Sequence, residues 1–191
     1  MNLAKCVDSV GIKPEEFVLN ALASGKAVLE PNEREMGVIV ADIGGGTTDL
    51  ALYMQGTVWH TQVIPIGGYH ITNDIAIGLR APYEVAEQVK IQHGDCRPAE
   101  IDPNFVFTVE PFGGEKIQVG RQDLAHVIEA RTEEIFQLIL QEIRRSGYDG
   151  LLPAGIVLTG GSAQLRGITT IAERVLNVPT AWPAPKMWWA W

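Results

Sequence analysis

The chain has 191 residues, of which 46% are hydrophobic and 20% are charged, and its formal net charge is −8. This composition is typical of a globular protein with one sizeable domain or two small ones, and the acidic balance argues against a broad nucleic-acid-binding surface. The two cysteines, Cys6 and Cys96, lie far apart in no metal-binding pattern, which argues against a disulfide framework and against a structural zinc site.

Short helices and three strands are predicted in the first part of the chain. Helices are expected over residues 2–10 and 21–28, and strands over residues 38–42, 47–54 and 57–64. Pro31 and Asn32 are expected to break the chain between these two groups of elements. The continuous apolar run from Val38 indicates a strand that is buried on both faces. Together the three strands predict an antiparallel meander.

The remaining chain predicts mostly helices, with one hairpin and one more strand. Helices are expected over residues 70–79, 82–94, 122–145 and 165–176, a hairpin over residues 105–110 and 116–119, and a strand over residues 155–158. The longest helix is predicted because apolar residues recur every three or four positions and Gly147 follows its end. This order predicts an α/β fold with a small α+β subdomain inserted near residues 80–120.

A glycine-rich turn follows the first predicted strand, in the run Asp-Ile-Gly-Gly-Gly-Thr-Thr-Asp at residues 42–49. Glycines let main-chain N–H groups approach a ligand closely, and threonine hydroxyls add donors. The candidate nucleotide-binding residues here are Gly44, Gly45, Gly46, Thr47 and Thr48. Asp42 is a candidate catalytic group that holds a metal-bound water or orients an attacking one. The other interpretation is a hairpin turn that binds nothing.

Two further candidate sites lie later in the chain. A buried strand runs into Gly160, Gly161 and Ser162, whose small size lets a flat group such as a purine lie against the backbone. Glu87 and Lys90 share one helical face and are suited to ribose hydroxyls and the edge of a base. Each feature also has an ordinary explanation, namely a strand-to-helix connection and an exposed ion pair.

Other site signatures are absent from the sequence. It contains no GxxxxGK[ST] loop, no GxGxxG turn and no zinc-protease spacing, and its four histidines form no ligand cluster. We find no secretory signal and no apolar run of the ~20 residues that span a bilayer. We therefore expect a cytoplasmic protein.

Taken together, the motifs resemble the second half of proteins of the actin, Hsp70 and hexokinase superfamily, and most closely the FtsA family of bacterial cell-division proteins. The likeness is carried by IPIGG at residues 64–68, ITNDIA at residues 71–76, AEQVK at residues 86–90 and SGY at residues 146–148. The resemblance implies an actin-like (ribonuclease H-like) α/β fold, with the first glycine turn as the second phosphate loop and the second turn as the adenosine loop. It further implies ATP and Mg²⁺ as cofactors, the metal being held through ATP and through a water on Asp42.

The resemblance also implies a domain division. It assigns residues 1–36 to the end of the family's first domain, residues 37–79 and 121–180 to an actin-like core, residues 80–120 to an inserted subdomain, and residues 181–191 to an atypical tail. This tail contains four of the five tryptophans. The family's first domain, which carries the first phosphate loop, has no counterpart in the sequence, so we expect a truncated protein that binds ATP weakly and lacks efficient hydrolysis.

The function that the resemblance implies is a link between the FtsZ ring and the inner membrane. It implies docking of the FtsZ C-terminal peptide on the inserted subdomain, self-association into actin-like filaments, and a place at the cytoplasmic face of the inner membrane at the division site. The family's membrane anchor is not found in this sequence, and no nucleic acid is expected as a partner. An Hsp70-like chaperone ATPase fragment, a small-molecule kinase and a remnant without ligand remain as alternatives.

Overall fold

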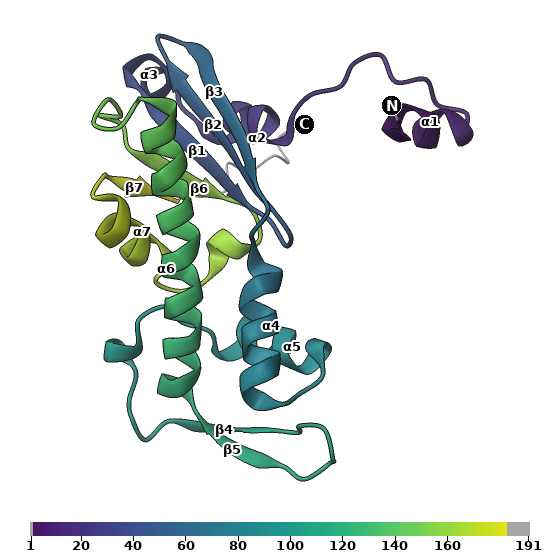
Figure 1. The fold of residues 1–191 in the computed structure, drawn as a ribbon, viewed down its shortest axis with the longest axis vertical. Coiled ribbons are helices and arrows are strands. Elements are labelled where there is room, and N and C mark those ends of the chain that lie inside the picture. Colours follow the sequence, from purple (N-terminus) through teal and green to yellow (C-terminus); the bar gives the residue numbers. More distant parts are fainter. Residues whose placement is uncertain (1, 183–191) are drawn as a thin grey trace, which may run out of the picture.

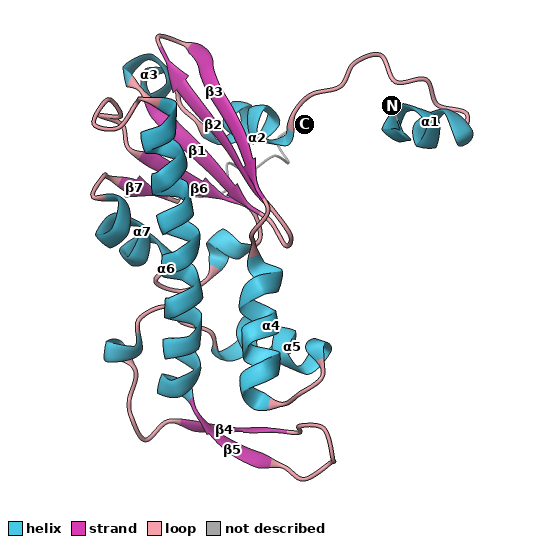
Figure 2. Cartoon of the chain, viewed as in Figure 1, coloured by secondary structure: helices cyan, strands magenta, loops and turns pink. Residues whose placement is uncertain are grey.

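The computed structural model describes residues 2–182 (Figure 1). The helices are α1 Asn2–Ser9, α2 Asn20–Val28, α3 Pro31–Met36, α4 Gly68–Leu79, α5 Tyr83–His93, α6 Arg121–Ser146 and α7 Ile168–Leu176, with 3-10 turns η1 Pro98–Glu100 and η2 Ser162–Gln164. The strands are β1 Val38–Ile43, β2 Thr48–Met54, β3 Thr57–Ile64, β4 Val106–Val109, β5 Ile117–Gly120, β6 Ile156–Thr159 and β7 Thr180–Ala181. Helices and strands are thus mixed along the chain (Figure 2), and the predicted α/β class is confirmed.

Five strands form the main sheet, in the order β3-β2-β1-β6-β7. β1 pairs antiparallel with β2 and β2 with β3, so the predicted meander is present. β6 joins the other side of β1 in parallel, with Asp42 opposite Thr159. Because parallel strands run in the same direction, the turns that follow β1 and β6 leave the sheet at the same edge.

Both faces of the main sheet are covered. Successive side chains of a strand point to opposite faces, and in β1 the odd-numbered Ile39, Ala41 and Ile43 belong to a large core that includes the buried side of α6. The even-numbered Val38 and Val40 belong to a smaller core on the α2 side. Figure 1 shows α6 crossing one face of the sheet while α2 lies behind the strands.

Helix α2 is fixed against the sheet by contacts at its C-terminal half. Gly25 lies so close to Tyr53 that a Cβ at residue 25 would overlap the Tyr53 hydroxyl. The Arg34 guanidinium donates hydrogen bonds to the carbonyls of Gly25, Lys26 and Leu29, at 3.3, 3.3 and 2.9 Å. The Gly25 carbonyl also accepts the Leu29 N–H at 3.1 Å, so Arg34 adds a second donor there and supplies donors to the Lys26 and Leu29 carbonyls at the end of the helix.

The prediction that Pro31 and Asn32 break the chain is wrong, because Pro31 begins helix α3. A proline costs no backbone hydrogen bond at the first helical position. Glu30 precedes it as the N-cap, and its backbone N–H donates to the Glu33 carboxylate at 2.7 Å in a capping box. Because Glu30 and Glu33 cap it, a helix begins at the proline where a break in the chain was expected.

The second part of the molecule lies beyond one end of the sheet, where α4, α5 and the β4–β5 hairpin gather around the long helix α6 (Figure 2). The Arg131 guanidinium of α6 makes two hydrogen bonds to the Asp74 carboxylate of α4, at 2.6 and 3.0 Å. At the far end of α4, the Phe112 N–H donates to the Arg80 carbonyl at 2.9 Å. Helix α4 thus connects the sheet edge to the hairpin.

The N-terminal arm differs from the rest of the described chain. Helix α1 has no buried residue, and Leu3, Val10 and Ile12 are more than half exposed. Figure 1 shows this arm extending away from the sheet. At the other end, Trp182 is exposed, and the rest of the predicted tryptophan-rich tail, residues 183–191, lies outside the described residues. None of the helices within residues 2–182 is both long and apolar enough to cross a membrane.

Candidate functional site

The two glycine turns meet at the edge of the main sheet. The Ser162 hydroxyl in the second turn donates a hydrogen bond to the Gly44 carbonyl in the first turn, at 2.9 Å. The same carbonyl accepts the Gly68 N–H at the start of α4, also at 2.9 Å. Gly44 therefore joins three segments that are far apart in the sequence.

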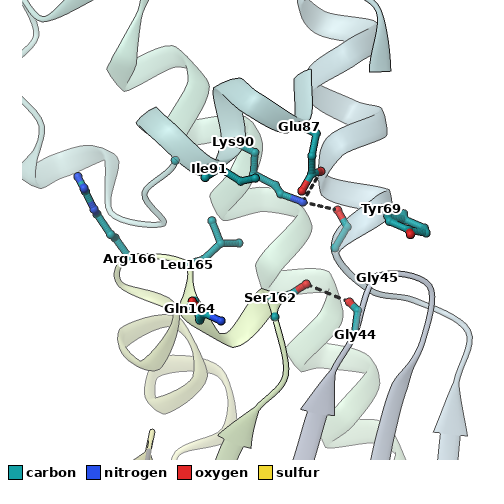
Figure 3. Close-up of a pocket in the computed structure, with 13 residues that line it drawn as sticks. Gly44, Gly45, Tyr69, Glu87, Lys90, Ile91, Ser162, Gln164, Leu165 and Arg166 are labelled. Carbon is teal, nitrogen blue, oxygen red and sulfur yellow. Dashed lines mark hydrogen bonds and ion pairs between the residues drawn. The ribbon is translucent and has the colours of Figure 1, made fainter. Parts of the chain in front are cut away.

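A pocket of about 480 Å³ opens beside this junction (Figure 3). Its volume lies within the range of ~300–1,000 Å³ typical of small-molecule sites. The structure brings six of the predicted residues together in its lining: Gly44, Gly45, Glu87, Lys90, Gly161 and Ser162. Further lining residues that the sequence did not single out are Gly68, Tyr69, Ile91, Gly94, Gln164, Leu165 and Arg166.

Lys90 is held by three acceptors inside the molecule. Its ammonium lies 3.2 Å from the Gly68 carbonyl, 2.7 Å from the Thr72 hydroxyl and 2.8 Å from the Glu87 carboxylate. An ammonium has three N–H donors, so all of them are used within the protein. Because Lys90 is almost fully buried, its side chain orients its neighbours rather than reaching into open space.

Glu87 is the accessible member of this network. Its Oε2 accepts hydrogen bonds from Lys90 and Thr72, and about one third of its side chain is exposed. Partial burial acts to raise the pKa of Glu87, but the Lys90 and Thr72 hydrogen bonds and the Lys90 charge outweigh it, so the pKa lies below its ordinary value. At neutral pH Glu87 is therefore a fixed carboxylate at the pocket wall, suited to accept hydrogen bonds from ligand hydroxyls.

One end of the pocket is apolar. Ile91 of α5 and Leu165, which follows η2, lie on opposite sides of the pocket in Figure 3. Ile91 is 72% exposed, which leaves an apolar surface free on the pocket wall. A flat apolar ring between these two side chains would cover both of them.

The N–H groups of the first turn and those at the start of α4 differ in whether they find an acceptor within the protein. Gly68 and Tyr69, at the start of α4, donate to the carbonyls of Gly44 and Gly45 at 2.9 and 2.8 Å. Within the described residues, the N–H groups of Gly45 and Gly46 meet no protein acceptor. The amides of the turn, rather than those of the helix, are therefore free to bind an anion such as phosphate.

The remaining predicted residues lie outside the pocket lining. Gly46 and Thr47 are exposed at the tip of the turn. Thr48 is fully buried and its hydroxyl donates to the Ile66 carbonyl at 2.8 Å, so this hydroxyl faces the protein interior. Gly160 packs against Asp42, which is half-buried on the α2 side of the sheet.

Asp42, which is predicted to hold a metal-bound water, lies near the end of β1. The part of the chain that the structure describes contains no group of three or more His, Cys, Asp or Glu side chains arranged to hold a metal ion. Mg²⁺ bound to a nucleotide needs only one or two carboxylates, because phosphates and waters supply its other ligands. That Asp42 holds Mg²⁺ through a water stays a prediction.

Acidification is expected to destabilise the fold through protonation of His93, which lies at the end of α5. The ring of His93 stacks on the ring of Phe107, with the two ring centroids 4.1 Å apart. Burial, together with the positive charges of Arg121 and Arg166, lowers the pKa of His93 below 6.5. The folded state therefore holds the neutral form, and this contribution to stability is complete above the ordinary pKa and lost as the pH falls through the lowered pKa.

We expect the Tm of the wild type to fall as the pH is lowered from about 7.5 to about 5.5, and the Tm of His93→Gln to fall less over the same range. Scanning calorimetry across this pH range measures the effect. His126→Gln, which changes an exposed histidine of α6, serves as the matched control and should keep the wild-type slope. An equal slope in wild type and His93→Gln would contradict the assignment.

Comparison with known proteins identifies close sequence relatives. The family model for "Cell division protein FtsA" matches residues 39–188. The chain is 42% identical over 186 residues to the FtsA protein of Pseudomonas aeruginosa, covering 96% of the chain and 44% of that protein. It is 40% identical over 192 residues to the Escherichia coli protein, covering 96% of the chain and 46% of that protein. The chain thus spans less than half the length of these relatives.

Solved structures with the same fold are actin-like proteins. MreB5 of Spiroplasma citri bound to ADP superposes with a TM-score of 0.78 at 20% identity, covering 97% of this chain and 60% of that one. The ethanolamine utilization protein EutJ from Carboxydothermus hydrogenoformans superposes with a TM-score of 0.69 at 24% identity, covering 95% and 55%. The predicted actin-like fold is therefore confirmed.

Proposed function

The chain belongs to the FtsA family of cell-division proteins, and from this premise we propose that it binds ATP between its two glycine turns. The observation that carries the proposal is the Ser162–Gly44 hydrogen bond, which places both turns on one pocket. A structural neighbour, MreB5, has been solved bound to ADP. The geometry of the pocket supports actin-type ATP binding best, and family membership supports participation in cell division.

The proposed pose assigns a chemical role to each part of the pocket. The free amides of Gly45 and Gly46 would bind phosphate oxygens, and Asp42 would hold a nucleotide-bound magnesium ion through a water. The Glu87 carboxylate accepts hydrogen bonds from the ribose hydroxyls. The base lies at the apolar end of the pocket. Lys90 does not bind the nucleotide in this pose, because it holds Glu87 and the start of α4 in place.

Nucleotide titration tests the proposal. We expect the chain to bind Mg-ATP saturably at millimolar concentrations, and Glu87→Gln to weaken binding about fivefold to tenfold because a charge-assisted hydrogen bond becomes a neutral one. Isothermal titration calorimetry measures both constants. Glu84→Gln changes an exposed carboxylate on the same helix outside the pocket and should bind like wild type. A wild-type sample that shows no saturation would instead support a remnant without ligand.

Family membership supports further proposals about partners. We propose that the FtsZ C-terminal peptide docks on the inserted subdomain, residues 80–120, that the protein self-associates, and that it acts at the cytoplasmic face of the inner membrane. In this region Phe105, Phe112 and Ile117 expose apolar side chains around the hairpin. Exposed apolar surface of this kind is suited to a partner. One structural neighbour has been solved as the MamK double helical filament, which supports self-association.

Peptide binding is expected to depend on the hairpin. We expect a fluorescently labelled FtsZ C-terminal peptide to bind the chain, and Phe112→Ser to weaken binding about tenfold, since aromatic anchors dominate such interfaces. Fluorescence anisotropy measures the affinity. Val63→Ser removes an apolar side chain of β3 that is 51% exposed, against 71% for Phe112, and is the control. If both variants bind like wild type, the docking site lies elsewhere.

A further inference from the structure

Helix α2 supplies a polar contact to the end of strand β1. We propose that Ser24 is a positioning residue that orients the Asp42 carboxylate toward a magnesium-bound water; this inference rests on the proposed nucleotide function. The Ser24 hydroxyl donates to Asp42 Oδ2 at 2.5 Å. A hydroxyl that donates to a carboxylate oxygen in this way limits the rotation of the carboxylate.

The second oxygen of Asp42 is confined but has no partner. A Cβ at residue 160 would lie 2.5 Å from Asp42 Oδ1, so the backbone of Gly160 limits how far the carboxylate can turn. Among the described residues, Oδ1 accepts no hydrogen bond, while Oδ2 is bound to Ser24. One oxygen is therefore fixed by the protein, and the other remains available to accept a hydrogen bond from a ligand or water.

Ser24 can hold this geometry because its helix is itself fixed. The next residue, Gly25, packs directly under Tyr53, and Arg34 binds the last carbonyls of α2. A hydroxyl on a rigid helix places the carboxylate without an entropic cost at the moment the ligand binds. The segment before the main sheet thus contributes to the site, although no residue of α2 lines the pocket.

Because Asp42 lies apart from the pocket, the contacts to adenosine and the contacts made through magnesium depend on different residues. Asp42 and Ser24 lie outside the pocket formed by Glu87, Gly161 and their neighbours. The adenosine half of ATP therefore makes its contacts without Ser24. A bound magnesium ion adds affinity through its waters and phosphates, and only this added part depends on how Asp42 is oriented.

The test compares ATP affinity with Mg²⁺ and with EDTA, by calorimetry on the full chain. In wild type, the dissociation constant measured in EDTA is expected to exceed the one measured with Mg²⁺. Ser24→Ala is expected to reduce this EDTA-to-Mg²⁺ ratio about fivefold and to leave the EDTA dissociation constant unchanged. Ser24→Thr keeps the hydroxyl and should restore the ratio. Ser146→Ala removes a hydroxyl at the end of α6 that bonds only to the Ile143 carbonyl and should behave like wild type.

The outcomes separate this inference from the function on which it rests. Wild-type protein that binds no ATP would overturn the proposed function, and the role of Ser24 with it. Wild-type protein that binds ATP with a magnesium ratio unaffected by Ser24→Ala would overturn the role of Ser24 alone. An equal rise in the EDTA and Mg²⁺ dissociation constants of Ser24→Ala would also overturn it, because that result indicates a general structural effect. Circular dichroism of each variant verifies that it is folded.

Discussion

Gly160→Ala is expected to lower the free energy of unfolding by about 2–5 kcal/mol and to abolish measurable ATP binding. Gly160 has a φ of +90°, a region that costs an L-residue about 1–2 kcal/mol. The added methyl carbon would lie 2.5 Å from Asp42 Oδ1 and 2.6 Å from the Ile43 carbonyl oxygen. Because both contacts belong to β1, relief of the overlap must separate the two glycine turns.

Thermal unfolding and calorimetric titration measure the two consequences. For a chain of this size the loss corresponds to a fall in Tm of about 5–15 °C. Gly46→Ala is the matched control, since Gly46 lies in the first turn at an ordinary φ and a Cβ there would meet no atom within 4 Å. It should unfold within about 2 °C of wild type. Equal destabilisation by both substitutions would show that the close approach of the turns is not the cause.

Lys90→Met is expected to have the second largest effect, lowering stability by about 2–3 kcal/mol and ATP affinity at least about tenfold. The substitution removes the ammonium that donates to the Gly68 carbonyl and to the Thr72 hydroxyl, and the Gly68 carbonyl keeps only its weaker neutral donors such as the Thr72 hydroxyl. It also leaves the Glu87 carboxylate without its ion pair. Since Glu87 is partly exposed, water compensates some of this loss, and the estimate lies below that for a fully buried pair.

Both measurements have a clear control in the same molecule. Lys116→Met removes an exposed lysine from the hairpin and should change neither the Tm nor the ATP affinity. The expected pattern for Lys90→Met is a joint loss, because the same side chain holds the start of α4 and the pocket carboxylate. Weakened ATP binding with unchanged stability would instead indicate that Lys90 contacts the nucleotide directly.

Elements with a regular pattern of apolar residues, or with turn residues at their ends, were predictable from the sequence. The predicted third strand matches β3, and the predicted helix over residues 122–145 differs from α6 by one residue at each end. The helix expected from residue 165 begins only at Ile168, because η2 and the left-handed Gly167 occupy the preceding positions. Strand β7 has two residues, too few for any pattern to indicate.

The site was predictable where a residue acts through the backbone or through local spacing. Residues of both glycine turns and the Glu87–Lys90 pair line one pocket, and their role in binding a nucleotide stays a prediction. Thr72, which bridges Lys90 and Glu87, and Ser24, which binds Asp42, carry no local signal because each acts across a tertiary contact. Their roles follow only from how α2 packs on the sheet and how α4 packs on α5.

The central claim is that the two glycine turns form opposite walls of one nucleotide site. Nuclear magnetic resonance titration of the ¹⁵N-labelled chain with Mg-ATP tests it most directly. The account predicts that the amide resonances of Gly45 and Gly46 and those of Gly161 and Ser162 shift together, with a single dissociation constant. Saturable shifts confined to one turn, or two different dissociation constants for the two turns, would contradict it.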